Sequence, residues 1–478
     1  MLGRMESSTF TRPERGAEIE LSVEGLAYGG NGIARLENGA EGRGGYVVFV
    51  GGAVPGDRVR AVITKRKRGY AEARTLEVLD PSPERIAPVA DHPGAPWQVL
   101  PYERQLAVKQ EQVHDALTRI GRLEGFVLDD IVPAVEQWRY RNKLEYSFGT
   151  SATGELVCGF HAPGSWHEIV PIGDCLLASE RSNAAREQVV AWCRAQGLTA
   201  LDRREPVRPG PDGQPTRRSA THSGMLRNLV VREGRRTGEL QVRLVSGPGE
   251  LDTDSLAAAV DCEGLMWTRT EALAETTQGG TTEVVAGARK LQEEISGLRL
   301  TISPLAFFQT NTEMAERLYA IAADLAGLQG WERVYDLYCG IGTVGLSLAA
   351  RAGEVWGLEI VEEAVADAIS NARRNEIDNA KFFAGDVRLA LRELAEEAGR
   401  PDVCLLDPPR AGLSQKVVRR VIEANARRIV YISCNPTTLA PNAAQLVEAG
   451  YALRRVVPVD MFPQTPHIEC VALLERAT

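Results

Sequence analysis

Two side chains near the C-terminus could act together in catalysis, a thiol and a carboxylate. Cys434 follows an apolar, β-branched run at 428–432 and precedes Asn-Pro, and Glu469 lies 35 residues further on. This pattern predicts a buried strand that ends in a turn at Cys434. Open α/β sheets bind their ligands at such strand ends. A lone cysteine, however, is more often a small core residue, and an acid near a chain end is usually a solvated surface group. A catalytic role for this pair therefore requires other signs of a binding site in the sequence.

A glycine-rich turn supplies the first part of that site. Residues 339–345 read Cys-Gly-Ile-Gly-Thr-Val-Gly between a predicted strand and an apolar helix pattern. Glycines let the backbone turn tightly and approach a ligand, and a helix N-terminus offers unpaired amide donors. Glu359 ends the next predicted strand 19 residues after Gly340, where nucleotide-binding folds place an acid against a ribose hydroxyl. Without further support, the glycines could equally serve helix packing.

Two more acids end predicted strands in the same region. Asp386 follows the apolar segment 381–385, and Asp407 follows 403–406 and precedes Pro-Pro-Arg410. Each acid alone could simply cap the following helix. Four consecutive strands that place polar features at one sheet edge predict a cofactor crevice instead, in a largely parallel α/β sheet.

Together these segments resemble the RNA 5-methyluridine methyltransferases, class I enzymes that use S-adenosylmethionine. The resemblance rests on residues 336–345, 407–410, 433–436 and 467–470, with two upstream segments at 140–143 and 307–311. It implies that Cys434 adds to carbon 6 of uracil and that Glu469 removes the proton from carbon 5. The residues that it implies for cofactor binding are Gln309, Tyr338, Glu359, Asp386 and Asp407. Tyr338 stands where relatives often have phenylalanine, and Thr343 replaces an asparagine found in some relatives.

The chain departs from the family in one segment. Many relatives hold an iron–sulfur cluster with three closely spaced cysteines and a fourth further on. Residues 85–106 keep the flanking pattern without any cysteine, and Cys175 resembles the fourth ligand. Because such a cluster usually needs four thiolates, we predict that none is bound and that no metal site replaces it. His92 is expected to be a solvated loop residue, and Pro93, Pro96 and Trp97 are expected to fill the space of the cluster.

The resemblance and the strand patterns divide the chain into three domains, giving a multidomain α/β protein. Residues 15–80 alternate like short strands and resemble the TRAM domain, a small barrel of the oligonucleotide-binding type, whose basic run at 60–74 would grip RNA. Residues 81–300 form a predicted central α+β domain, which includes the cysteine-free segment 85–106. Residues 139–148 alternate basic and aromatic side chains, which suits either phosphates and unstacked bases or a strand with one solvated face. A Pro, Gly and Arg-rich stretch at 203–218 predicts an irregular loop. Residues 301–478 form the predicted Rossmann-like methyltransferase domain.

Composition sets wider limits. The chain has 478 residues, of which 44% are hydrophobic, with eight cysteines and a net charge of −9. We expect a cytoplasmic monomer, because no apolar run of membrane-spanning length and no signal-peptide pattern is present. The net negative charge means that RNA contacts must be local. DNA and membranes are not expected partners.

The sequence therefore predicts an S-adenosylmethionine-dependent enzyme that makes 5-methyluridine in structured RNA. Ribosomal 23S RNA is the expected substrate, because a TRAM domain is commoner among those relatives than among the transfer-RNA enzymes. A transfer-RNA enzyme and a non-catalytic RNA-binding assembly factor remain alternatives. Amino-directed and cytosine-directed methyltransferases fit less well, since the former have an aromatic residue after Asp-Pro-Pro, where Arg410 stands, and the latter a cysteine within that motif.

Overall fold

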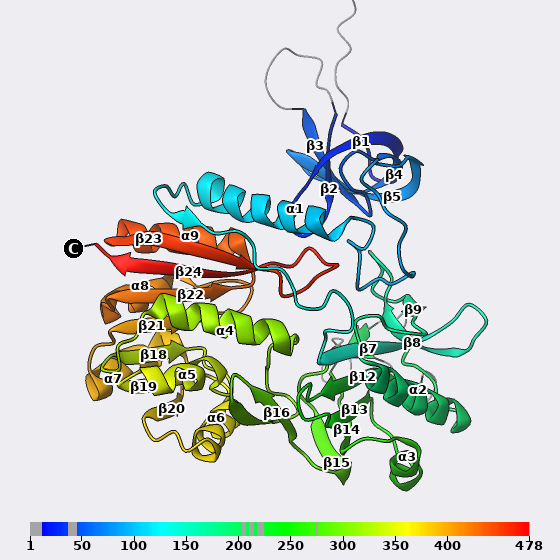
Figure 1. Ribbon diagram of the computed structural model, residues 1–478. Coiled ribbons are helices and arrows are strands. Elements are labelled where there is room, and N and C mark those ends of the chain that lie inside the picture. The colour runs from blue at the N-terminus through cyan, green and yellow to red at the C-terminus, as the bar shows by residue number, and fades with distance from the viewer. Residues whose placement is uncertain are drawn as a thin grey trace, which may run out of the picture.

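The computed structural model of the chain describes residues 12–36, 45–202, 207–209, 215–217, 224–272 and 276–477. Most of the loop predicted at 203–218 lies outside these residues. Three bodies are visible: a small barrel at the N-terminus, a central sheet, and a larger C-terminal sheet with helices on both faces (Figure 1). The predicted fold class, a multidomain α/β protein with an N-terminal barrel, is confirmed.

The N-terminal body is a closed barrel with strand order β1-β2-β3-β5-β4. Its strands alternate buried apolar and exposed polar side chains, as Leu21 and Val23 do within β1, so one face of each strand fills the barrel. The strands are β1 (Glu18–Leu26), β2 (Gly32–Leu36), β3 (Tyr46–Gly51), β4 (Arg58–Arg66) and β5 (Tyr70–Asp80).

The central body is a seven-stranded sheet with order β15-β14-β13-β12-β7-β8-β9, packed against helix α2. Two short hairpins, β10–β11 and β16–β17, lie outside this sheet. The elements are β7 (Lys143–Thr150), β8 (Leu156–His161), β9 (Ile169–Pro171), α2 (Glu180–Ala195), β10 (Val207–Pro209), β11 (Pro215–Arg217), β12 (Leu226–Glu233), β13 (Leu240–Ser246), α3 (Thr253–Ala259), β14 (Gly264–Arg269), β15 (Thr281–Gly287), β16 (Leu291–Ile295) and β17 (Leu298–Ile302).

The C-terminal sheet has eight strands in the order β20-β19-β18-β21-β22-β24-β23-β6. Its first five strands run parallel, whereas β24 runs antiparallel between β22 and β23. The strands are β6 (Val127–Leu128), β18 (Arg333–Leu337), β19 (Glu354–Glu359), β20 (Ala380–Ala384), β21 (Val403–Leu406), β22 (Arg428–Ser433), β23 (Tyr451–Val459) and β24 (Glu469–Arg476).

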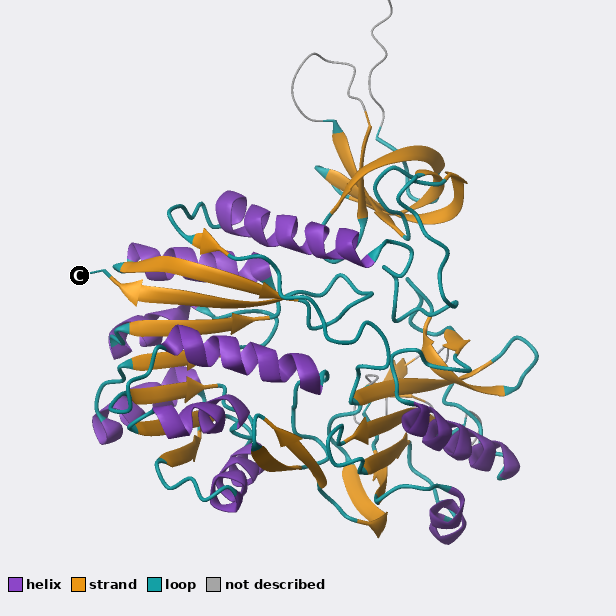
Figure 2. Ribbon diagram, viewed as in Figure 1, coloured by secondary structure: helices purple, strands orange, loops and turns teal. Residues whose placement is uncertain are grey.

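Helices cover both faces of this sheet (Figure 2). One apolar cluster joins the sheet to α4 (Thr312–Ala326), α5 (Thr343–Leu348) and α6 (Glu362–Arg374). A second cluster on the opposite face involves α1 (Tyr102–Asp115) with its π-helical continuation η1 (Ala116–Ile120), α7 (Val387–Ala398), α8 (Gln415–Ala424) and α9 (Pro436–Glu448). A single 3₁₀ turn, η2 (Ala349–Arg351), follows α5. Helix α1 and strand β6 thus pack with the C-terminal sheet, although they lie early in the chain.

Candidate active site

The register of β22 and β24 brings the thiol and the carboxylate together. Ser433, the last residue of β22, pairs with Cys470 across an antiparallel ladder, so the next residues, Cys434 and Glu469, face each other at the sheet edge. Asn435 then caps helix α9, because its side chain accepts a hydrogen bond from the Thr437 amide at 3.0 Å. Cys434 is therefore held between the end of a strand and the start of a helix.

Burial and charge set the proton affinities of this pair. Burial raises the pKa of the Cys434 thiol to about 12, and the neighbouring carboxylates of Glu469 and Asp407 also raise it. The pKa of Glu469 is raised well above its usual value, chiefly because the side chain is buried and also because Asp407 is near. Arg410 acts in the opposite direction on both groups and favours their charged forms. Burial thus raises the pKa of both groups, and Arg410 opposes that rise.

Arg410 was not singled out from the sequence as a functional residue. It follows the Asp-Pro-Pro motif directly, and that position was the available signal. Its guanidinium also lowers the pKa of His467, which burial depresses to about 4. His467 is therefore neutral at physiological pH, and Arg410 supplies the positive charge at this end of the site.

The predicted ribose acceptor lies at the glycine turn. The Glu359 carboxylate accepts hydrogen bonds from the Gly340 amide at 3.2 Å and the Val361 amide at 2.9 Å. Gly342 has φ of 84° and begins helix α5, a conformation that favours glycine. Tyr338 also has positive φ, 69°, which turns the chain sharply after β18. These contacts fix the backbone of the turn that would face a nucleoside.

Tyr338, Glu359 and Asp386 lie close together at the ends of β18, β19 and β20, at one end of the sheet edge. Burial raises the pKa of the Tyr338 phenol to about 12, and the charges of Asp386 and Glu359 add to that rise. Asp386 caps helix α7 through the Arg388 amide and pairs with the Arg388 guanidinium, which lowers its pKa. The alternative that this acid serves as a helix cap is thus correct for Asp386, which also lies beside the predicted aromatic wall.

Asp407 belongs to the opposite end, near Cys434 and Glu469. Burial, together with the charge of Asp336, raises the pKa of Asp407 to about 7. Asp336 is itself buried, accepts a hydrogen bond from the Gly345 amide at 2.8 Å, and has a pKa raised to about 7. Sequence reasoning did not give Asp336 a role of its own. Asp336 is buried and Asp407 is partly buried, and their raised pKa values mean that a cationic ligand beside them would favour their ionised forms.

Gln309 lies in the segment before α4, which contacts both the central body and the loop before Glu469. Gln309 is buried, and its backbone carbonyl accepts a hydrogen bond from the Asn142 side chain at 2.8 Å. Asn311 caps α4 and donates to the Met461 carbonyl at 2.9 Å. Gln309 is thus connected to the central body and to the loop that leads to Glu469.

The basic and aromatic segment at 139–148 serves a structural purpose. Tyr140, Tyr146 and Phe148 are fully buried, so the prediction that these aromatic faces stack on RNA bases is wrong. The alternation reflects a strand with one buried face. Tyr140 donates to the Pro463 carbonyl at 3.0 Å, which ties this segment to the loop before Glu469.

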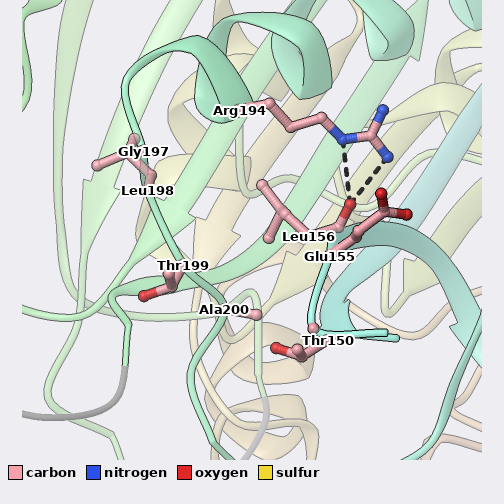
Figure 3. A pocket seen from close by; sticks show the side chains of 9 residues that line it. Thr150, Glu155, Leu156, Arg194, Gly197, Leu198, Thr199 and Ala200 are labelled. Carbon is pink, nitrogen blue, oxygen red and sulfur yellow. Dashed lines mark hydrogen bonds between the residues drawn. The ribbon is translucent and has the colours of Figure 1, made fainter. Parts of the chain in front are cut away.

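A separate hollow of about 430 Å³ lies in the central body, between the start of β8 and the end of α2 (Figure 3). The guanidinium of Arg194 faces it, but two of its nitrogens donate to the Leu156 carbonyl, at 2.8 and 3.1 Å. None of the residues predicted for catalysis or cofactor binding lines this hollow.

Comparisons with known proteins agree with this geometry. Residues 297–477 match the model of the tRNA (uracil-5-)-methyltransferase family, and residues 12–76 match the TRAM domain. An RNA methyltransferase of Clostridium tetani is 35% identical over 97% of this chain and 98% of its own length. A second, from Bacteroides thetaiotaomicron, is 37% identical over 94% of this chain and 100% of its own. The chain belongs to this family of RNA methyltransferases.

A solved relative of the family covers almost the whole chain. The crystal structure of Pyrococcus abyssi tRNA (uracil-54, C5)-methyltransferase, in complex with S-adenosyl-L-homocysteine, superposes with a TM-score of 0.73. It is 26% identical and spans 95% of this chain and 100% of its own. The predicted family is confirmed, and so is the S-adenosylmethionine dependence that the family shares. The buried acids of the crevice fit the sulfonium cation of this cofactor.

His92 and Cys175, which lie where the resemblance implied iron–sulfur ligands, form a buried polar contact. Nε2 of His92 lies 3.2 Å from the Cys175 Sγ, and both side chains are buried. The prediction that His92 is solvated is wrong; burial lowers its pKa. Trp97 is buried as expected, with the Lys109 ammonium 5.7 Å from its ring centroid, whereas Pro96 is exposed.

These donors do not suit an iron–sulfur cluster, which requires several thiolates around one position. Within the described residues, no group of three or more His, Cys, Asp and Glu side chains is arranged to hold a metal ion. Among the described helices, none has the length and apolar character needed to cross a membrane. The absence of a cluster and the cytoplasmic location stay predictions.

Proposed function

We propose that this enzyme transfers a methyl group from S-adenosylmethionine to carbon 5 of a uridine in structured RNA, with Cys434 as nucleophile and Glu469 as general base. The observation that supports this proposal is the antiparallel register of β22 and β24, which pairs Ser433 with Cys470 and so brings their neighbours Cys434 and Glu469 near each other. Gln309, Tyr338, Glu359, Asp386 and Asp407 would hold the cofactor, with Glu359 toward the ribose.

The chemistry of uracil explains why both groups are needed. Carbon 5 is too weak a nucleophile to accept a methyl group until a thiolate has added to carbon 6 and generated an enolate. S-adenosylmethionine, when bound, supplies the electrophilic methyl group. Carbon 5 then carries both a proton and the methyl group. Glu469 removes the proton, the double bond re-forms, and the bond between Cys434 and carbon 6 breaks.

The electrostatics of the site suit both steps. A thiol with a pKa near 12 is protonated at neutral pH, so its proton must leave as attack begins, and the charge of Arg410 stabilises the thiolate. A raised pKa makes the ionised carboxylate of Glu469 a stronger base than an exposed one. Arg410 also favours that ionised form, so one cation assists both halves of the reaction.

Ribosomal 23S RNA is the proposed substrate, on the basis of the TRAM domain. A second candidate is transfer RNA, because the solved relative from Pyrococcus abyssi is a tRNA (uracil-54, C5)-methyltransferase and spans nearly the whole chain. In either RNA, the target nucleotide must leave its stack before carbon 6 can reach the thiol.

Methyl transfer from labelled S-adenosylmethionine to unmodified ribosomal and transfer RNA, in parallel reactions, tests this function. Wild type should form 5-methyluridine in one RNA, and Cys434→Ala should form none. Cys262→Ala is the matched control, since Cys262 is the other cysteine that is only partly buried. Glu469→Gln should methylate RNA but accumulate a covalent protein–RNA adduct that survives denaturing gel electrophoresis, because the carbon 5 proton stays in place.

Two outcomes would contradict the proposal. If Cys434→Ala retains full activity, the covalent route is wrong. If wild type binds RNA and cofactor but labels neither RNA, the non-catalytic assembly factor becomes the better explanation.

A further inference from the structure

The TRAM barrel inserts one turn into the active site. This turn joins β1 to β2 and is closed by hydrogen bonds from the Ala27 amide to the Asn31 carbonyl, 2.8 Å, and from the Gly30 amide to the Ala27 carbonyl, 3.0 Å. Between them, the Tyr28 hydroxyl donates to the backbone carbonyl of Cys434 at 3.1 Å. The contact joins residues that are 406 positions apart in the chain.

Tyr28 touches more than this carbonyl. Its ring packs against the apolar cluster between the C-terminal sheet and helix α9, and burial raises the pKa of its phenol to about 12. Arg410 lowers that pKa through its charge and through hydrogen bonding.

The same turn contacts the segment that leads to the base. Gly30 has φ of 92°, and a Cβ at this position would lie 2.9 Å from Cγ of Pro466 and 3.2 Å from Nε1 of Trp97. Pro466 precedes Glu469 by only three residues. A hydrogen bond also joins the barrel to α1 near this turn: the Gln112 side chain donates to the Leu26 carbonyl at 3.2 Å. Figure 1 shows the barrel resting against α1.

We propose that Tyr28 is a positioning residue for methyl transfer: it holds the Cys434 turn in place, while Gly30 seats the barrel on the segment before Glu469. This inference rests on the proposed function. The barrel then forms one wall of the uridine site, besides contacting RNA. RNA that binds to the barrel would therefore affect the position of Cys434 through Tyr28.

Tyr28→Phe removes the hydroxyl and keeps the ring. Tyr46→Phe is the matched control, since the Tyr46 hydroxyl also donates to backbone carbonyls, those of Lys67 and Tyr70, but within the barrel. At saturating RNA and cofactor, the single-turnover rate of Tyr28→Phe should fall roughly tenfold, the scale of one lost hydrogen bond beside a charged group. RNA affinity should stay within about twofold of wild type, and Tyr46→Phe should retain the wild-type rate.

A second readout follows the cysteine directly. In RNA that carries 5-fluorouridine, fluorine replaces the proton that Glu469 removes, so the methylated adduct of Cys434 at carbon 6 cannot resolve and accumulates. Tyr28→Phe should slow the appearance of this adduct by the same factor as turnover. A purely structural role in the barrel, or a role in RNA affinity alone, would leave the rate of adduct formation at saturation unchanged.

A glycine pair tests the seating of the turn. Gly29 and Gly30 have nearly equal φ, 91° and 92°, so alanine strains the backbone similarly at both. A Cβ at Gly29 meets nothing within 4 Å, whereas at Gly30 it meets Pro466 and Trp97. Gly30→Ala should therefore lower the single-turnover rate, and Gly29→Ala should lower it much less.

The outcomes separate this inference from the proposed function. If wild type makes 5-methyluridine while Tyr28→Phe matches Tyr46→Phe in both rates, the positioning role is wrong and the proposed function stands. If Tyr28→Phe loses RNA affinity alone, the barrel only grips RNA and the inference is overturned. If wild type makes no 5-methyluridine, both fail together.

Discussion

Asp407→Asn should stabilise the cofactor-free protein at alkaline pH while it impairs catalysis. The pKa of Asp407 rises from 3.8 to about 7 on folding, because burial and the charge of Asp336 disfavour the carboxylate. Between these two values the folded state binds a proton that the unfolded state has released. The stability of the wild type therefore falls as pH rises through that window, and the full penalty is present above pH 7. The asparagine side chain of the Asp407→Asn variant carries no charge, so the variant does not have this penalty.

The size of the effect follows from the width of the window. Between pH 5 and pH 7 the penalty grows by about 1.4 kcal/mol per pH unit, or about 2.7 kcal/mol in all. Asp407 keeps some contact with solvent, so roughly half of this, about 1.4 kcal/mol, is expected. For a domain of the size of the C-terminal body, a stability difference of this size changes the melting temperature by about 3–5 °C.

Thermal melting of wild type and Asp407→Asn at pH 8 and pH 5, without cofactor, measures this difference. The gain at pH 8 minus the gain at pH 5 cancels any packing effect of the amide. Asp386→Asn is the control: Arg388 lowers the pKa of Asp386, so the ionised form stabilises the fold at both pH values, and the substitution should destabilise the protein equally at pH 5 and pH 8. If Asp407→Asn shifts the melting temperature equally at both pH values, folding does not raise the pKa of the Asp407 carboxyl, and the reasoning fails.

Three further predictions concern the same region. Affinity for S-adenosylmethionine should rise with pH up to about 7 and then level off, because a sulfonium cation favours the ionised form of Asp407. Calorimetry across this range measures the affinity, and an affinity that does not change with pH would contradict this prediction. Lys109→Met should destabilise the protein by about 3–5 kcal/mol in melting experiments, because it leaves Asp460, 2.6 Å away and fully buried, without its partner. A double variant that also carries Asp460→Asn should regain part of that loss. Arg410→Gln should lower turnover at neutral pH and move the rising limb of the pH–rate profile to higher pH, since Arg410 favours the thiolate of Cys434; an unchanged profile would exclude that role.

Much of the C-terminal fold was predictable from local signals. Glycines after β18 and acids after β19, β20 and β21 mark strand ends without tertiary information. The position of β6 was not predictable in this way. It contains only Val127 and Leu128, too short a segment for any periodicity, and it exists because it pairs with β23 of the sheet.

The sequence predicted the site residues only where a recognisable motif stands at the end of a predicted strand. Glu359 ends β19 and Asp407 directly follows β21, so their place at the sheet edge could be inferred. Tyr28 could not, because it lies in another domain and meets Cys434 only after the barrel docks on α1. The aromatic alternation around Tyr140 was misread for a physical reason: a strand with one buried face and a stacking platform for bases have the same period of two.

The charge distribution explains why two bodies must share one reaction. Asp336, Asp407 and Glu469 lie near this sheet edge, and in their ionised forms they would attract a sulfonium cation and repel RNA phosphates. The exposed cations Arg66, Lys67 and Arg68 lie instead on the barrel, whereas Lys65 is paired with Glu72. In the proposed reaction the RNA backbone would stay on the basic side, and only a neutral, unstacked uracil would enter the acidic crevice. A turn of that same barrel then borders the nucleophile, which is the arrangement that a base delivered from the barrel side requires.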